Sequence, residues 1–294
     1  MTSSYSRSRP TTLAVVVAGS LGLLGCLDES EPELGDNQGD GAPDLTWEEF
    51  RATVYQEPGP NGAFIVDGDV PIRTEAALRD FYEAWRRQEG SASALTVMNI
   101  NGVDQIWPHL KRHALTYCVS NSFGSRKAQV VAQMQKSTAS WSDLVAVGYR
   151  YLPDQDASCT ASNDNVVFNV RPVSNSPFNA RAFFPHEARP DRELLIDDVA
   201  FTTTAGGRDF DGILRHELGH TLGFRHEQIH IDCPPNLETA DDSRQVTSYD
   251  VDSVMHYPQC RPSGGGGYRQ TKLDYQGAIT LYGLAGTLVD HVLN

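Results

Sequence analysis

The chain has 294 residues, of which 39% are apolar, a composition typical of a globular protein with an ordinary packed core and two or three domains at most. Its 38 acidic and 24 basic side chains give a formal net charge of -14. A nucleic acid or an anionic lipid surface is bound through a basic patch, because the negative charge of the partner must be offset. The charge balance therefore argues against both classes of partner.

The first 25 residues differ from the rest of the chain. They carry Arg7 and Arg9, no acidic residue, and a run of apolar and small residues from 11 to 25. This pattern predicts a secretion signal, since a membrane-spanning helix needs about 20 apolar residues and the run is shorter. The run ends in Leu-Leu-Gly-Cys, which resembles the lipobox of bacterial lipoproteins. That resemblance implies cleavage before Cys26 and a lipid on its thiol, with ordinary signal cleavage as the alternative.

Residues 26–44 are acidic, rich in Gly and Pro, and almost without large apolar side chains. Such a segment buries too little surface to fold alone, so we expect a solvated linker between a lipid anchor and the folded part. Leu27, in place of an aspartate after Cys26, indicates transport to the outer membrane if the host is Gram-negative. Whether the protein then faces the periplasm or the exterior is left open.

A first folded region is expected over residues 45–113. The apolar spacing predicts a helix over 45–55, a strand and turn over 63–72, and an amphipathic helix over 74–88. We expect this region to be small and separate from the part that follows.

Residues 114–294 are expected to form a second domain. Strands are predicted at 115–120, 145–152, 166–173, 180–185 and 193–201, and helices at about 125–141 and 210–224. Five strands with one early crossover helix predict an α+β fold built on a twisted, mixed sheet. The Gly-rich stretches at 202–209 and 262–267 are predicted to be loops.

Four cysteines remain once Cys26 is set aside: Cys118, Cys159, Cys233 and Cys260. An even set in an oxidising compartment predicts two disulfides. Three pairings are possible, and we favour Cys118 with Cys159 and Cys233 with Cys260, because each closes a short loop. A second metal site built on these four lacks CxxC spacing.

A short motif carries the chemistry, running from His216 through Glu217, His220 and Gly223 to His226. Residues four apart lie on one face of a helix, so His216 and His220 can offer two nitrogens to one cation. Gly223 is expected to end the helix, because glycine tolerates left-handed backbone, and the turn returns His226 as a third ligand.

Three protein nitrogens leave one coordination position open for water, which is typical of a catalytic zinc site. Glu217 is placed to hold and deprotonate that water as a general base for attack on a peptide carbonyl. The alternative is a helix that carries these residues only for packing or solubility. A chance match to five specified positions has odds of about one in ten thousand, so we set it aside.

This motif resembles that of the metzincin zinc peptidases. Metzincins carry a methionine turn beneath the zinc, and the segment from Ser253 to Tyr257 has its form, with Met255 as the methionine. The likeness is closest to the astacin group, which implies that Tyr257 ligates the zinc or binds the transition-state oxyanion. It also implies that Glu227, directly after His226, is linked to the amino terminus of a mature enzyme. For Met255 the alternative is an ordinary core methionine.

Residues 115–285 as a whole resemble bacterial HEIGH-type metallopeptidases, although Leu218 replaces the isoleucine of that motif. The resemblance implies a metzincin-like catalytic domain of two subdomains, with the zinc helix on the floor of a cleft. It also implies that an extended substrate lies along a strand at the cleft edge, for which residues 180–185 are our candidate. Backbone pairing there would favour peptides with little sequence preference.

A latency device is expected in the first folded region. Residues 64–70, Phe-Ile-Val-Asp-Gly-Asp-Val, resemble the Phe-x-Gly-Asp segment of astacin propeptides, although the phenylalanine lies further from the glycine. By this resemblance Asp69 binds the zinc in place of water, and cleavage at about residue 114 activates the enzyme. The alternative is a plain Asp-Gly-Asp turn in a hairpin.

The function that we expect is a secreted metalloendopeptidase with one catalytic Zn²⁺, acting on protein or peptide substrates as a monomer, with no nucleic-acid partner and only a lipid anchor in the membrane. One alternative is a non-catalytic surface lipoprotein that binds zinc or a peptide. A second is a zinc amidase acting on cell-wall amides, which the same metal chemistry permits.

Overall fold

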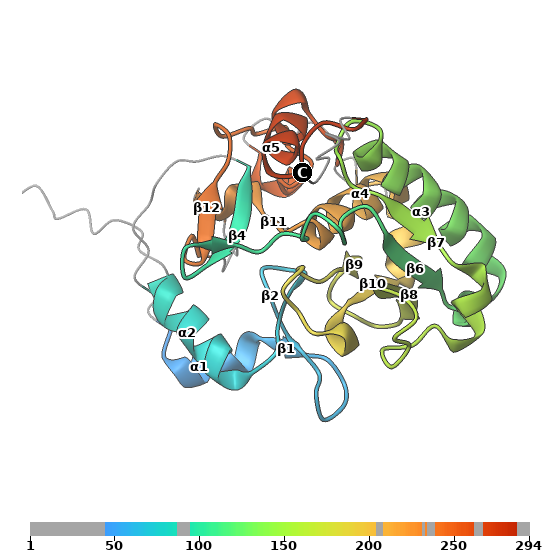
Figure 1. Ribbon diagram of the computed structural model, residues 1–294. Coiled ribbons are helices and arrows are strands. Elements are labelled where there is room, and N and C mark those ends of the chain that lie inside the picture. The colour runs from blue at the N-terminus through green and yellow to red at the C-terminus, as the bar shows by residue number, and fades with distance from the viewer. Residues whose placement is uncertain are drawn as a thin grey trace, which may run out of the picture. The chain divides into compact units, whose positions relative to one another are not determined.

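The structure is a computed structural model that describes residues 45–86, 95–203, 208–230, 233, 239–261 and 267–286 (Figure 1). All of them belong to one compact unit, Ala42–Asn294. The predicted signal, Cys26 and the linker to residue 44 lie outside the described residues, as do most of the two predicted Gly-rich loops. No helix in the described part of the chain is long and apolar enough to cross a bilayer.

The first described region contains two helices and a three-stranded sheet. Its elements are α1 (Trp47–Thr53), β1 (Tyr55–Gln56), β2 (Phe64–Val66), β3 (Val70–Ile72) and α2 (Glu75–Arg86). Thr46 and Glu49 form a capping box that begins α1. Strands β1, β2 and β3 pair antiparallel in that order, and Val66 faces Val70 across the turn that contains Asp69.

The predicted mixed sheet is confirmed, with five strands in the order β7-β6-β8-β10-β9. They are β6 (Leu115–Val119), β7 (Tyr149–Tyr151), β8 (Phe168–Val173), β9 (Ala180–Arg181) and β10 (Glu193–Asp197). The pairs β6–β7, β6–β8 and β8–β10 are parallel, whereas β9 runs antiparallel to β10 and forms an edge of the sheet. Strand β9 is shorter than predicted, because its pairing with β10 ends at Arg181. Phe183 and Phe184 are then buried in two different clusters.

Two helices, α3 (Lys127–Ser142) and α4 (Phe210–Thr221), pack against each other and against this sheet (Figure 1). The main core lies between them and includes Trp141 from α3, Leu214 and Leu218 from α4, and Val170 from β8. A last helix, α5 (Lys272–Tyr282), begins at a second capping box made by Thr271 and Asp274. Short 3-10 turns connect the elements at Asn121–Arg126, Pro153–Ser158, Arg189–Asp191, Asp198–Phe201, Glu227–His230 and Pro258–Cys260.

A second sheet was not predicted from the sequence. It consists of β4 (Thr96–Ile100), β5 (Val103–Asp104), β11 (Phe224–Arg225) and β12 (Ser243–Gln245), with β4 paired to the other three. Leu95 and Trp107, which flank β4 and β5, are buried in the main core. Residues 95–107 therefore pack as part of the second region, although the sequence assigned them to the first.

The two predicted disulfides, Cys118–Cys159 and Cys233–Cys260, are both present. Their Cα atoms lie 5.7 and 5.4 Å apart, as disulfide geometry requires. Cys118 and Cys159 are buried beside Val166, where the bond ties β6 to the loop after β7.

Candidate functional site

Four buried side chains meet at one point: Asp69 from the turn after β2, His216 and His220 from α4, and His226 just beyond β11. One ligand atom from each lies within 4.8 Å of all the others. The Asp69 carboxylate oxygens lie 3.1 Å from His226 Nε2, 3.6 Å from His216 Nε2 and 3.7 Å from His220 Nε2. The structure thus brings together the three predicted histidines and the predicted latency residue.

Helix α4 positions two of these histidines through its i, i+4 spacing. Asp209 begins the helix by accepting a hydrogen bond from the Gly212 N–H. The helix ends at Thr221, three residues before the predicted end, because Gly223 adopts a left-handed φ of +96°. A Cβ at Gly223 would lie 2.4 Å from the Gln105 carbonyl oxygen, so only glycine fits this turn, which carries His226 back to the site.

Each histidine ring is oriented by a hydrogen bond from its Nδ1. His216 donates to the Val254 carbonyl and His220 to the Phe224 carbonyl, both at 2.8 Å. His226 donates to the Asp67 carboxylate at 2.7 Å. Carbonyl and carboxylate oxygens only accept, so Nδ1 carries the proton and all three Nε2 lone pairs face one another.

This donor set fits a zinc ion. Four ligands at Zn–N and Zn–O distances of about 2.0–2.1 Å lie roughly 3.3 Å apart in a tetrahedron, and the Nε2 atoms of His216 and His226 are 3.2 Å apart. Two facing lone pairs are unfavourable without a cation between them. Asp69 Oδ1 and His220 Nε2 are buried without a hydrogen-bond partner among the described residues, as expected of ligand atoms.

The electrostatics favour the ligating forms. Burial and the neighbouring His226 and His216 lower the pKa of His220 to about 3, so its ring is neutral at neutral pH, as metal binding requires. Burial acts to raise the pKa of Asp69, but positive charge at the histidine cluster, first of all at His226, outweighs this effect and holds that pKa below its usual value.

Glu217 lies on α4 directly after the first ligand, is 2% exposed, and has one carboxylate oxygen without a hydrogen-bond partner in the described part of the chain. Burial, and then the charge of Asp69, raise the pKa of Glu217 well above its usual value. A carboxyl group with a raised pKa beside a metal site is suited to exchanging protons.

Met255 is fully buried against α4. A Cβ at Gly219 would lie 2.3 Å from Met255 Sδ, so glycine lets the helix approach the methionine turn closely. The turn also supplies the Val254 carbonyl that orients His216. Asp274 fixes it from α5, because its carboxylate accepts hydrogen bonds from Ser253 Oγ and the Val254 N–H.

The roles of Gly219, Asp274 and Asp67 were missed at the sequence level. A glycine in mid-helix is a signal of close packing, and the Thr-x-x-Asp pattern that ends at Asp274 is a readable helix start. Nothing in the sequence links Asp67 to His226, which lies 159 positions away.

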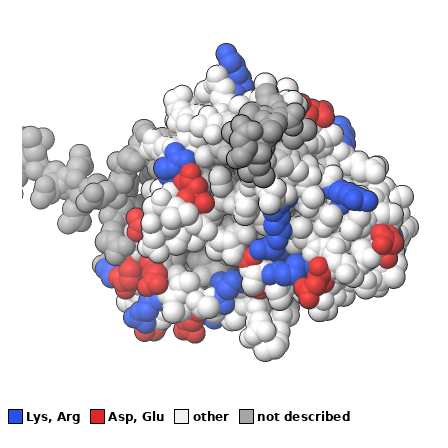
Figure 2. Space-filling view, in the orientation of Figure 1, with Lys and Arg blue, Asp and Glu red and all other residues white. Residues whose placement is uncertain are grey.

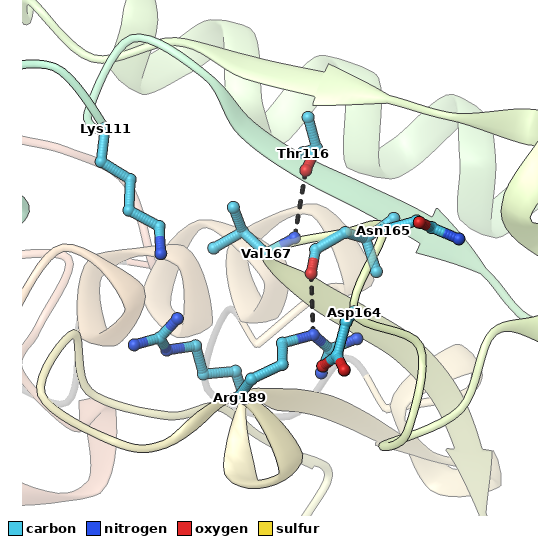
Figure 3. Close-up of a pocket in the computed structure, with 8 residues that line it drawn as sticks. Lys111, Thr116, Asp164, Asn165, Val167 and Arg189 are labelled. Atoms are coloured by element: carbon cyan, nitrogen blue, oxygen red, sulfur yellow. Dashed lines mark hydrogen bonds between the residues drawn. The ribbon is translucent and has the colours of Figure 1, made fainter.

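A separate pocket of about 260 Å³ shares no residue with this cluster (Figure 3). Its Arg189 is committed to the fold, since Nε donates to the Val166 carbonyl and Nη1 to Asn169 Oδ1. Lys111, Thr116, Asp164, Asn165, Val167 and Arg192 also line it. On the face seen in Figure 2, acidic and basic side chains are interspersed among uncharged residues.

No family model matches the chain. Two curated relatives from Oryzias latipes do, high choriolytic enzymes 1 and 2, each 36% identical over 67 residues. The match covers 18% of this chain and 25% or 24% of the relative, so the chain spans about a quarter of the length of the curated relatives it matches.

Two solved structures are similar over most of their own length. Myroilysin has 15% sequence identity and a TM-score of 0.44, with 64% of this chain and 98% of that chain covered. High choriolytic enzyme 1 of Oryzias latipes, a hatching enzyme zinc-protease, has 17% identity and a TM-score of 0.41, with 63% and 98% covered. Both TM-scores lie below 0.5, so the likeness described next rests on the geometry of the site and on the 67-residue match to the curated relatives.

The chain resembles the astacin-type zinc proteases. The metzincin-like α+β fold predicted from the zinc helix and the methionine turn agrees with this likeness. The narrower likeness to bacterial HEIGH-type metallopeptidases stays a prediction.

The astacin-like tyrosine, Tyr257, is not free to act in this structure. Its hydroxyl donates a hydrogen bond to the Asp67 carbonyl at 2.6 Å, while its ring centroid lies 4.3 Å from that of His226. The first described region therefore holds Tyr257 beside the ligands. Its role as ligand or oxyanion donor stays a prediction.

Glu227, the astacin-like carboxylate after the third histidine, is fully buried. One oxygen accepts a hydrogen bond from the Asp250 N–H, and the other has no partner among the residues described. Burial raises the pKa of Glu227 to about 9, to which the charges of Asp274 and Asp250 contribute. A cation placed beside the second oxygen, such as the mature amino terminus that the resemblance implies, would lower this pKa and stabilise the carboxylate.

Proposed function

We propose that this chain is a secreted, zinc-dependent metalloendopeptidase held in a latent form by residues 45–86. The observation that carries the proposal is the convergence of three imidazole Nε2 atoms and the Asp69 carboxylate on one point, with Glu217 beside them. A closed structural zinc site would not need that glutamate.

His216, His220 and His226 would hold the metal, and Asp69 would take the fourth position in the latent form. A bound zinc ion supplies a Lewis acid that polarises a peptide carbonyl and lowers the pKa of water. The histidines contribute neutral nitrogens, already oriented by their Nδ1 hydrogen bonds.

Glu217 would accept the proton of the attacking water and donate it to the nitrogen of the leaving amine. Departure of Asp69 removes the charge that helps to raise the pKa of Glu217, which brings this carboxyl closer to the range of a general base. Tyr257, once released from the Asp67 carbonyl, would donate its hydroxyl hydrogen to the oxyanion.

The substrate would lie extended along the edge strand β9 and the segment that follows it. Strand β9 ends the five-stranded sheet, so its outer edge would be available for backbone pairing once the first region has been removed. Phe184, three residues further on, has its ring 5.4 Å from that of His220. The first region occupies this edge, because Phe184 is buried in its cluster with Phe50 and Trp85.

Latency would therefore have two parts, an aspartate on the metal and a covered cleft edge. The boundary predicted at 113–114 is better placed between residues 86 and 95, because cleavage at 114 would remove β4 from the sheet that it forms with β11 and β12. The proposed pro-region is thus residues 45–86.

Export with a lipid anchor on Cys26 is proposed from the sequence. Two disulfides support an oxidising compartment. We also propose that the substrate is a protein or peptide, because a strand edge can pair with an extended backbone. The protein is proposed to act as a monomer.

A panel of casein, gelatin and peptidoglycan tests the reaction class, with Glu217→Gln as the matched inactive variant. The proposal expects the processed wild-type protein to cleave casein or gelatin and Glu217→Gln to cleave neither. Release of peptidoglycan fragments alone would favour a zinc amidase. Zinc binding with no hydrolysis of any of the three would favour a binding lipoprotein.

A further inference from the structure

Asp67 contacts the third zinc-ligand candidate directly. Its carboxylate accepts the Nδ1 hydrogen of His226 at 2.7 Å, and the two side chains are 2% and 0% exposed. The other two histidines donate their Nδ1 hydrogens to Val254 and Phe224, in the second region of the chain. His226 is thus oriented by the region that we propose is removed.

The backbone presents Asp67 in a fixed pose. Val66 pairs with Val70, which closes the turn between β2 and β3. Asp67 has a left-handed φ of +44° and Gly68 a φ of +86°. A Cβ on Gly68 would lie 2.9 Å from the Tyr257 hydroxyl, which donates to the Asp67 carbonyl at 2.6 Å.

A carboxylate on the Nδ1 hydrogen of a ligating histidine fixes its tautomer and raises the basicity of Nε2. Losing such a partner lowers metal affinity by about 10–100-fold. Asp67 is well placed for this effect, because its bond to His226 is buried and lies in a low-dielectric surrounding.

We propose that Asp67 is a positioning residue for the metal: by holding His226 it makes the latent chain retain zinc more tightly than the processed chain. Removal of residues 45–86 then opens a coordination position and also loosens a ligand. This inference rests on the zinc site of the proposed function, but not on peptidase activity.

The test is the rate of zinc transfer from the full chain to an excess of a chromophoric chelator. Wild type is compared with Asp67→Gly, which tolerates the left-handed φ and lacks the carboxylate, and with Asp67→Asn, which also suits that φ and keeps a neutral acceptor. We expect transfer about 10–100-fold faster for Asp67→Gly and an intermediate rate for Asp67→Asn.

A second comparison shows whether Asp67→Gly acts by removing the hydrogen-bond partner of His226 or by loosening the turn that carries Asp69. Asp67→Gly is measured again in an Asp69→Asn background. If Asp67 acts through His226, the acceleration persists there, and the visible spectrum of the cobalt-substituted protein changes with Asp67 in both backgrounds. If the acceleration disappears without the Asp69 ligand, Asp67 acts only by placing Asp69 and the inference is wrong.

Equal transfer rates for wild type and Asp67→Gly would also overturn the inference while leaving the zinc site intact. Failure of the wild-type chain to bind zinc at all would instead overturn the proposed function. Thermal unfolding of the metal-free variants shows whether faster zinc transfer reflects general destabilisation of the fold. If it does, Asp67→Asn should transfer zinc as fast as Asp67→Gly, and not at the intermediate rate that the inference predicts.

Discussion

Gly219 lies against Met255 so closely that any larger residue would force the buried Met255 side chain to move. A Cβ at Gly219 would be 2.3 Å from Met255 Sδ and 3.5 Å from the ring of Trp141 behind it. This contact sets the distance between helix α4 and the methionine turn, whose Val254 carbonyl orients His216.

Gly219→Ala is therefore expected to destabilise the protein, although alanine is the better helix former. Overpacking a fully buried contact costs about 1–3 kcal/mol, against about 1 kcal/mol gained in helix propensity. We expect a lower midpoint of chemical denaturation for Gly219→Ala. Met255→Ala provides space, so the double variant should be more stable than the sum of the two single changes predicts. A strictly additive double variant would contradict the packing account.

Asp69→Asn is expected to give the unprocessed chain measurable casein cleavage, but slower than that of the processed protein, because the first region still covers the cleft edge beside Phe184. The asparagine side chain is uncharged and is a weak metal ligand, so the fourth position opens to water. Asp80→Asn, on the exposed face of α2, is the matched control and should leave the chain latent. The latency assignment fails if Asp69→Asn stays as inactive as wild type while processing still activates it.

The ion pair between Glu57 and Arg181 is expected to hold the first region against the five-stranded sheet. Arg181 is fully buried and donates from Nε and Nη2 to the two Glu57 oxygens at 2.6 and 2.7 Å. Removing one partner of a buried pair costs about 3–5 kcal/mol, so Glu57→Gln should weaken docking of residues 45–86. Limited trypsin digestion should then remove this region much faster than in wild type. Glu48→Gln changes an exposed glutamate of α1 and should digest like wild type.

Asp274 gives the stability a pH dependence. Burial raises the pKa of Asp274 to about 6, although Ser253 and the Thr271 and Val254 N–H groups donate to it. A folded pKa above the unfolded value means that the folded chain binds the proton of Asp274 more tightly than the unfolded chain does. The contribution of this proton to the free energy of unfolding is therefore full below about pH 4 and is lost as the pH rises to about 6. The loss should be at most about 3 kcal/mol. Asp274→Asn should be less stable overall and should lack this component of the slope in denaturation series from pH 4 to 7. An unchanged slope would contradict the raised pKa.

The histidine cluster and α4 could be predicted from the sequence because their information is local. His216 and His220 are one helical turn apart, and Gly223 marks its own turn by needing a φ of +96°. The five-stranded sheet was also predictable, because short apolar stretches, such as residues 194–196 in β10, recur at intervals along residues 115–201.

The second sheet could not be predicted in the same way. Strand β4 pairs with β11 and β12, which follow it by more than a hundred residues and are only two and three residues long. Such short segments carry no readable alternation. The contact of Asp67 with His226 escapes prediction for the same reason, because it depends on where the turn after β2 docks and not on local spacing.

The most direct test is zinc content and casein cleavage, measured together for the protein beginning after Cys26, before and after limited proteolysis, and for Glu217→Ala under the same conditions. We predict one zinc ion per chain in both proteins, with cleavage by the processed wild type and none by Glu217→Ala. If both proteins bind zinc and neither cleaves after residues 45–86 are removed, the site is a binding site and not a peptidase.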